Sequence, residues 1–220
     1  MMKAILLVLI FVLLGVLAFY FRDNFSESLE RGLEETAALE IRELINADCK
    51  THECCVIFDF KKLEDLCLLC YKSQSADRIL YLISYFEFGE FFKEFDKFIE
   101  KLDFGDWQKR NFKVECLRLG NHDFKSVDVE SKAMPIIQKK LNDKINYDMH
   151  ECDIIFFVYI VDNKCYFGVD FAGFEMNKRG YKIFLHPSSI RGTIAYSLVR
   201  ESGFGKKETM LDPFSKDGVV

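Results

Sequence analysis

Residues 112–126 of the 220-residue chain, the stretch that decides the fold, are Phe-Lys-Val-Glu-Cys-Leu-Arg-Leu-Gly-Asn-His-Asp-Phe-Lys-Ser. Apolar and polar side chains alternate over 111–117, which is typical of a strand with one buried face. Residues 128–141 have the apolar spacing of a helix, interrupted by Pro135. The stretch therefore predicts a strand, a short loop and a helix.

Two further strands are predicted C-terminal to this stretch, over 153–161 and 166–171. The residues between them, Asp162-Asn163-Lys164, are typical of a hairpin turn. Residues 190–201 predict a last helix that ends before Gly203.

Helices and strands also alternate N-terminal to this stretch, which indicates a small α+β unit. The helix over 88–102 carries phenylalanine at apolar spacings of three and four, and we expect it to be core or a packing seam between domains. The other predicted elements are a helix over 28–45, a strand over 54–60, a helix over 61–70 and a strand or mixed apolar element over 78–86.

The bulk composition limits the kind of protein. About half of the residues are apolar, enough for two compact units. The formal net charge of -5 argues against a protein coated in positive charge, so nucleic-acid binding would require a local basic patch. The eight cysteines show no regular close spacing and are expected to be free thiols in a reducing compartment.

Residues 4–21 form an apolar run that is long enough to span a bilayer. No small-x-small cleavage site follows the run, which disfavours a cleaved signal peptide. One interpretation is a cytoplasmic protein that associates with a membrane through 4–21. The alternative is that 17–21 form the first buried strand and the rest is an extension.

Three blocks resemble, in their order and spacing, the THUMP family of RNA-modification enzymes. The second block, 168–182, is Gly-Val-Asp-Phe-Ala-Gly-Phe-Glu-Met-Asn-Lys-Arg-Gly-Tyr-Lys, and the third, 211–218, is Leu-Asp-Pro-Phe-Ser-Lys-Asp-Gly. The first is 112–126, quoted above, which resembles the family's strand ending in Arg and its Phe-x-Ser step into a helix. Arg31-Gly-Leu-Glu-Glu also resembles the first helix of the ferredoxin-like domain that precedes the THUMP core.

The sequence His-Pro-Ser-Ser-Ile-Arg-Gly-Thr-Ile-Ala at 186–195, leading into Asp212, resembles the tRNA guanine-N2 methyltransferases. The resemblance implies that S-adenosylmethionine is the cofactor of the full-length family. Its binding motif would fall here on Asp212, Pro213, Phe214 and Gly218, with one glycine where the fuller motif has two. The family's catalytic motif would lie beyond Val220, so no catalytic residue is assigned and no methyl transfer is expected from this chain alone.

The resemblance implies an α+β chain with an N-terminal ferredoxin-like domain, a THUMP α/β domain and the truncated start of a Rossmann-like methyltransferase domain. The expected divisions are a hydrophobic segment over 1–21, the ferredoxin-like domain over 22–105, the THUMP domain over 106–182, and a linker helix with the methyltransferase start over 183–220.

Two loops are expected to form a basic patch that binds tRNA, and the resemblance implies the acceptor stem or the 3′ end. Groups at a helix N-terminus bind phosphate, and an aromatic ring stacks on an unpaired base. The first loop contributes Arg118, His122, Lys125 and Ser126, and the second contributes Lys178, Arg179, Tyr181 and Lys182.

Several of these residues have structural alternatives. Arg118 could instead pair with Asp123 or Asp128, Tyr181 could be a core aromatic, and His122 could only cap its loop. Cys67-Leu-Leu-Cys70 has metal-ligand spacing, with His52, Cys54 and Cys55 upstream. The pair lies within an apolar predicted helix, where cysteine behaves as a small hydrophobe, so no metal site is predicted.

The leading functional hypothesis is a tRNA-binding module that delivers tRNA to a separately encoded methyltransferase domain. A second is that the chain is the N-terminal fragment of a complete tRNA methyltransferase gene. A third is a membrane-anchored interaction domain that has lost RNA binding.

Overall fold

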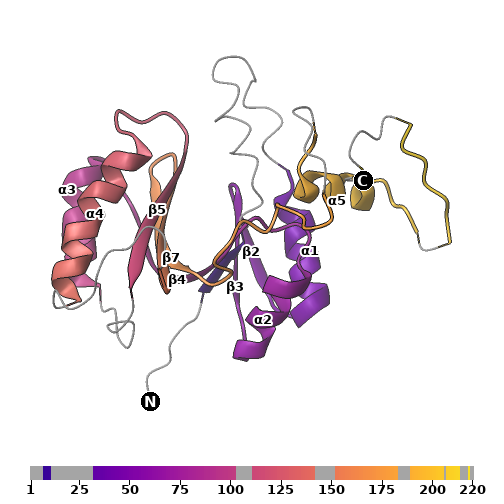
Figure 1. Ribbon diagram of the computed structural model, residues 1–220, viewed down its shortest axis with the longest axis horizontal. Helices are drawn as coiled ribbons and strands as arrows, with labels where there is room; N and C mark the ends of the chain where they lie inside the picture. The colour runs from indigo at the N-terminus through magenta and orange to yellow at the C-terminus, as the bar shows by residue number, and fades with distance from the viewer. Residues whose placement is uncertain are drawn as a thin grey trace. The chain divides into compact units, whose positions relative to one another are not determined.

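A computed structural model describes residues 7–10, 32–102, 111–141, 152–182, 189–205, 207–213 and 218. The chain forms two compact units: unit 1 comprises residues 1–79 and 174–220, and unit 2 comprises residues 80–173. Unit 2 is therefore an insertion into unit 1. Helices and strands alternate in both units, which confirms the predicted α+β class (Figure 1).

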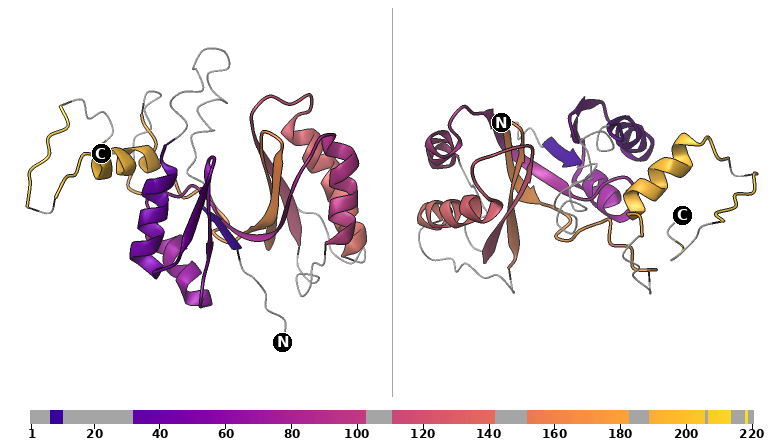
Figure 2. Two further views of the ribbon diagram at one scale, coloured as in Figure 1. Left: turned by 180° about the vertical axis from the view of Figure 1, so that it is seen from behind. Right: turned by 90° about the horizontal axis from the view of Figure 1, so that it is seen from above.

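Unit 1 contains a sheet of three strands in the order β2-β3-β1. Strand β3 (Cys55–Asp59) pairs antiparallel with both β1 (Leu7–Ile10) and β2 (Cys49–His52). Helices α1 (Glu34–Ile45) and α2 (Leu63–Lys72) pack against each other, and α1 also contacts β2 and β3. Both helices lie on one side of these strands (Figure 2).

Helix α5 (Gly192–Glu201) also belongs to unit 1 and packs against α1. The contact is polar: Thr36 Oγ1 donates to Glu201 Oε1 over 2.6 Å, and Arg200 pairs with Glu43. The chain thus returns to the N-terminal unit after passing through unit 2.

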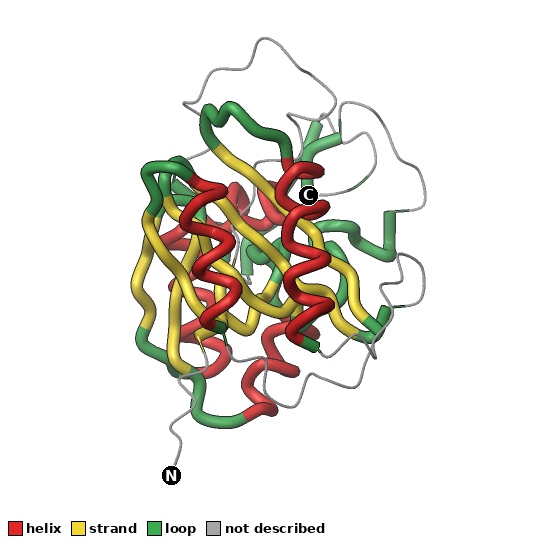
Figure 3. Tube along the Cα trace, turned by 90° about the vertical axis from the view of Figure 1, so that its left-hand side faces the viewer, coloured by secondary structure: helices red, strands yellow, loops and turns green. Residues whose placement is uncertain are grey.

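Unit 2 contains a sheet of four strands in the order β4-β7-β6-β5. Strands β5 (Phe112–Leu119) and β6 (Ile154–Val161) are parallel neighbours, and helix α4 (Ser126–Lys140) lies between them in sequence. Strand β7 (Lys164–Asp170) pairs antiparallel with both β6 and β4 (Ile79–Glu87). Helices α3 (Phe91–Lys101) and α4 lie side by side over one face of the sheet (Figure 3).

The core of unit 2 lies between this sheet and its two helices. This core includes Phe91, Phe95 and Ile99 of α3. The rings of Phe156 on β6 and Phe167 on β7 stack, with their centroids 5.8 Å apart. The phenylalanine-rich helix is therefore part of the core of unit 2, as one of its two interpretations predicted.

Each predicted helix or strand from residue 34 onward has a counterpart, and two details differ. Strand β2 was not predicted, because its exposed Lys50, Thr51 and His52 lack an apolar pattern. Helix α4 continues through the exposed Pro135, because Val129, Ala133 and Ile137 bury one face of the helix on both sides of it.

The structure gives no support to the membrane anchor predicted over residues 4–21. Among the described residues, no helix has both the length and the apolar character needed to cross a bilayer. Residues 7–10 instead form β1, and the rest of 4–21 lies outside the described residues, as do 17–21 of the alternative interpretation.

Candidate RNA-binding surface

The loop that follows β5 is fastened to the hairpin between β6 and β7. His122 Nε2 and the Asp162 carbonyl oxygen are 2.6 Å apart, and the Asp162 N–H donates to the Leu119 carbonyl oxygen over 3.0 Å. Gly120 has a φ of 102°, and a Cβ there would lie 2.4 Å from Asp162 Oδ1. Glycine at 120 and His122 thus hold the loop in place, which is the structural role considered for His122.

Arg118 lies near the end of β5 and is partly buried. Its guanidinium carbon is 5.4 Å from the centre of the Phe124 ring, and its Nε is buried without a hydrogen-bond partner among the described residues. In the part of the chain that the structure describes, no ion pair joins Arg118 to Asp123 or Asp128, so that alternative finds no support. Arg118 remains a cation without a neutralising carboxylate there.

Helix α4 begins directly after this loop. The Lys125 N–H donates to Asp128 Oδ2 over 2.7 Å, so this carboxylate caps the first turn. The Lys125 side chain is exposed, and Ser126 is the partly buried first residue of the helix. Arg118 and Lys125 thus place two positive charges near the start of α4.

The second predicted loop, residues 178–182, lies in unit 1, where its charged residues have partners. Lys178 Nζ is 2.7 Å from Glu175 Oε2, although 77% of its side chain is exposed. Arg179 donates to the carbonyl oxygens of Met176 and Gln74. Because its guanidinium is held by backbone carbonyls, Arg179 has a structural role in unit 1.

Tyr181 is 59% exposed, so the alternative of a core aromatic is wrong. Lys182 Nζ donates to Ser189 Oγ and lies 3.4 Å from the Ile190 carbonyl oxygen. Lys182 thus fastens the chain before α5, while the ring of Tyr181 is open to a ligand. The first loop lies in unit 2, and residues 178–182 lie in unit 1.

The residues of the partial cofactor motif do not build a binding site in the described chain. Asp212 is partly buried, Pro213 is exposed, and Phe214 lies outside the described residues. Gly218 has a φ of 68° with open space where a Cβ would lie, which suits a turn that approaches a ligand. Residues 207–213 form neither a helix nor a strand.

Neither the cysteines nor the acidic residues form a metal site among the described residues. All eight cysteines are free, and Cys67 and Cys70 lie on α2. Desolvation raises the pKa of the buried Cys165 thiol well above its ordinary value. The buried Cys165 is therefore a packing residue.

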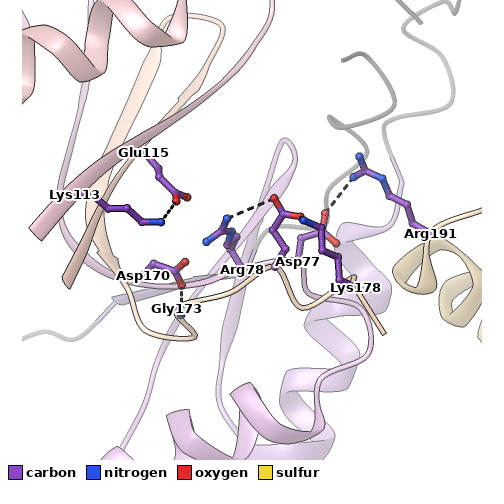
Figure 4. Close-up of polar contacts among 9 residues, drawn as sticks. Asp77, Arg78, Lys113, Glu115, Asp170, Gly173, Lys178 and Arg191 are labelled. Carbon is purple, nitrogen blue, oxygen red and sulfur yellow. Dashed lines mark hydrogen bonds and ion pairs between the residues drawn. The ribbon is translucent and has the colours of Figure 1, made fainter. Parts of the chain in front are cut away.

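Asp77, in the loop before β4, is a charged residue that the sequence did not single out. It is 1% exposed, and Arg191 Nη1 lies 3.3 Å from its Oδ2 (Figure 4). Burial raises its pKa to about 7, while Arg191 acts in the opposite direction. Asp77 precedes an apolar strand by two positions, and no pattern in the sequence distinguishes it from a turn residue.

Two family models match the chain. Residues 90–170 match the THUMP domain, and residues 179–219 match the RMKL-like methyltransferase domain. The first match covers α3 and β5 to β7, which include Arg118 and Lys125. The second covers Arg179, Tyr181, Lys182 and helix α5.

Two curated relatives are archaeal proteins named tRNA (guanine(6)-N2)-methyltransferase. The protein from Methanocaldococcus jannaschii is 32% identical over 56% of this chain and 34% of its own length. The protein from Archaeoglobus fulgidus is 26% identical over 90% of this chain and 52% of its own length. The chain therefore spans about half or less of the length of these relatives.

A solved structure supports the same fold. The match with the crystal structure of SMU.472 complexed with SAH covers 92% of this chain and 50% of that one, with a TM-score of 0.65 and 16% identity. From these matches, the chain carries a THUMP domain over residues 90–170, followed by a segment of an RMKL-like methyltransferase domain over residues 179–219.

Proposed function

We propose that this chain binds tRNA and presents it for methylation at the N2 atom of a guanine. The observation that carries the proposal is the THUMP match over 90–170, whose β5–α4 corner holds Arg118 and Lys125 without an opposing ion pair. The curated relatives are named for this reaction on tRNA, which supports the choice of substrate.

The RNA contacts that we propose divide into two kinds. Arg118, Lys125 and Lys178 supply positive charge for phosphate oxygens, and Ser126 supplies a hydroxyl at the start of α4. Tyr181 supplies an exposed ring for an unpaired base. His122, Arg179 and Lys182 each hold their own loop in place through backbone or hydroxyl oxygens.

S-Adenosylmethionine is the methyl donor in this proposal. The methyltransferase match over 179–219 supports this donor, as does the SAH complex of SMU.472. The described residues contain no assigned catalytic group, so we propose that a methyltransferase sheet beyond them supplies the chemistry, encoded in a separate chain or in the same gene. We also propose a ferredoxin-like domain ahead of the THUMP domain, and the start of a Rossmann-like domain over 183–220.

Salt-dependent binding of unmodified tRNA tests the proposal. Changing Arg118 and Lys125 together to Ala should weaken binding and reduce the slope of log affinity against log salt by about 1.5 to 2, because each phosphate contact releases a counterion. Tyr181→Ala should weaken binding by about 1 to 3 kcal/mol with the slope unchanged, because stacking involves no counterion.

The matched control is the pair Lys93→Ala and Lys97→Ala, which removes two exposed positive charges from α3 in the same unit. This control should change affinity less than twofold. Equal losses in both double variants would show that only net charge matters, and no binding by the wild type at low salt would refute tRNA binding. Methyl transfer by the chain alone would contradict the proposal that catalysis lies elsewhere.

A further inference from the structure

Phe124, in the loop between β5 and α4 of unit 2, is a side chain to which the proposed function gives no role. Its ring is partly buried and packs against the core of the unit. It stacks on Phe91 of α3, with the ring centroids 4.6 Å apart and the planes inclined by 20°, and the Phe92 centroid lies 5.1 Å away. The first turn of α3 thus supports one face of the Phe124 ring.

The loop that carries Phe124 is also fixed through its own residues. The centroid of the His122 ring lies 5.1 Å from that of Phe124, and His122 Nε2 is 2.6 Å from the Asp162 carbonyl oxygen. Gly120, with its φ of 102°, brings the start of the loop against Asp162. The place of Phe124 is therefore determined both by α3 and by the hairpin between β6 and β7.

Arg118 is the cation that meets this ring. Its guanidinium carbon lies 5.4 Å from the centre of the Phe124 ring, within the range over which an aromatic face attracts a cation. Its Nε is buried and has no hydrogen-bond partner among the described residues, whereas its two terminal nitrogens are not buried in this way. In the described part of the chain, the Phe124 ring is thus the group that orients the guanidinium, and the outer end of the guanidinium is open to a ligand.

Two carboxylates in the first turns of α4 are engaged by the backbone. Asp128 accepts the Lys125 N–H over 2.7 Å, and Glu130 accepts the Cys116 N–H over 2.8 Å. A carboxylate beside Arg118 would neutralise its charge, whereas an aromatic ring holds a guanidinium without cancelling the charge. The arrangement therefore keeps a positive charge in a fixed orientation.

We propose that Phe124 is a positioning residue for RNA binding, which holds the Arg118 guanidinium ready to meet a phosphate oxygen of tRNA. This inference rests on the proposed function, because it takes Arg118 to contact the tRNA backbone. A planar guanidinium binds a phosphate through a pair of N–H groups, so the orientation of its plane matters as well as its charge. An arginine that is already oriented loses less side-chain freedom when the phosphate binds.

Titration of the full chain with unmodified tRNA tests this role through Phe124→Leu and Phe124→Tyr. Leucine is apolar but has no ring, and it should weaken binding by about two- to fivefold, the size expected of one exposed cation–π contact. Tyrosine keeps the ring and should retain the wild-type affinity. In a chain that already carries Arg118→Ala, Phe124→Leu should have no further effect, because no guanidinium is left to position.

Phe98→Leu is the matched control, because it removes another partly buried ring from the same unit. The Phe98 ring packs on Phe86, with the centroids 4.4 Å apart, rather than on Arg118. This variant should leave the tRNA affinity unchanged. Thermal unfolding of each variant establishes that the chains compared are folded.

Proton NMR of the chain without tRNA gives a readout that is independent of RNA binding. The ring current of Phe124 should shift the Arg118 side-chain protons upfield in the wild type and in Phe124→Tyr. These protons should return to their ordinary positions in Phe124→Leu. Ordinary positions in the wild type would overturn the proposal, even if Phe124→Leu failed to fold.

The binding experiment can overturn the proposal in three further ways. Equal losses from Phe124→Leu with and without Arg118 would show that Phe124 acts through the fold alone. Wild-type affinity in Phe124→Leu, or the same loss in Phe124→Tyr as in Phe124→Leu, would show that the ring does not serve Arg118. If the wild type binds no tRNA at low salt, the proposed function itself fails, and this inference fails with it.

Discussion

At the scale of single residues, Glu40 shows how one buried side chain organises unit 1. It lies on α1 and is 5% exposed, and its two oxygens take four hydrogen bonds from Ser73, Gln74 and Ser75. The carboxylate therefore satisfies backbone N–H groups of a loop that no helix or strand satisfies. Glu40 thus accepts hydrogen bonds from this loop as a capping residue does, although the loop is more than 30 positions away in the sequence.

Glu40→Ala should destabilise the protein by about 3 kcal/mol, because it leaves buried donors without an acceptor. The midpoint of urea unfolding measures this loss. Glu43→Ala, on the exposed side of the same helix, should cost less than about 1 kcal/mol, since exposed ion pairs contribute little. Similar losses in the two variants would show that only helix propensity had changed.

The basic residues can be identified from the sequence, but the groups to which they are hydrogen-bonded or paired in the fold cannot. Arg179 and Lys182 belong to a cluster that resembles an RNA-binding loop, yet Arg179 is bound to Gln74, which is 105 positions away. Asp77 was overlooked for the same reason, because its partner Arg191 is 114 positions away. Charge is visible in a sequence, whereas the neutralisation of that charge depends on the tertiary fold.

At the scale of elements, β4 and β7 approach each other closely at Gly168. A Cβ at Gly168 would lie 2.4 Å from the carbonyl oxygen of Tyr81. The pairing of the two strands shifts register between Leu82 and Ser84, immediately beside this glycine. Glycine at 168 therefore lets an irregular pair of strands stay hydrogen-bonded.

Gly168→Ala should destabilise unit 2 by about 2 to 3 kcal/mol, because backbone atoms must move to make room for the methyl group. Thermal unfolding and amide exchange along β4 measure this effect. Gly89→Ala, in the same unit, should change stability by about 0.5 kcal/mol or less, since the nearest atom is a flexible Glu94 oxygen at 3.8 Å. A Gly168→Ala variant with unchanged stability would show that β4 and β7 can move apart without destabilising unit 2.

Helices and strands whose apolar residues recur with a clear period could be predicted from the sequence. Those whose formation depends on packing against neighbouring elements could not. The buried strands β6 and β7 and the phenylalanine-rich α3 follow their own patterns. Strand β2 exists because β3 offers it a partner, with Lys50 opposite Ile57 and Thr51 opposite Val56. Helix α4 keeps Pro135 because the packing of its buried face outweighs the lost hydrogen bond.

At the scale of the whole molecule, unit 2 is inserted into unit 1 rather than following it. The chain enters unit 2 at residue 80 and leaves it at 173. Strands β4 and β7, at the two ends of the insertion, are paired neighbours, with Leu80 opposite Asp170. A linear order of domains was the natural prediction, because apolar periodicity does not show that residues 189–205 return to α1.

A fragment of residues 80–173 should fold alone, because it contains the four strands and both helices that form its core. A fragment of residues 90–173, which matches the THUMP model more closely, lacks β4 and exposes the edge of β7. It should aggregate or remain unfolded. Circular dichroism with size-exclusion chromatography distinguishes the two fragments, and equal behaviour would show that β4 is dispensable.

The pairing of Leu80 with Asp170 also determines how the protein responds to mechanical force. Tension that reaches unit 2 through its two connections pulls apart the ends of two antiparallel strands. The hydrogen bonds between β4 and β7 then carry the load one after another, starting at Leu80 and moving toward Glu87, instead of sharing it. An unfolding machine that pulls on either terminus would therefore separate β4 from β7 one hydrogen bond at a time, beginning at Leu80 and Asp170.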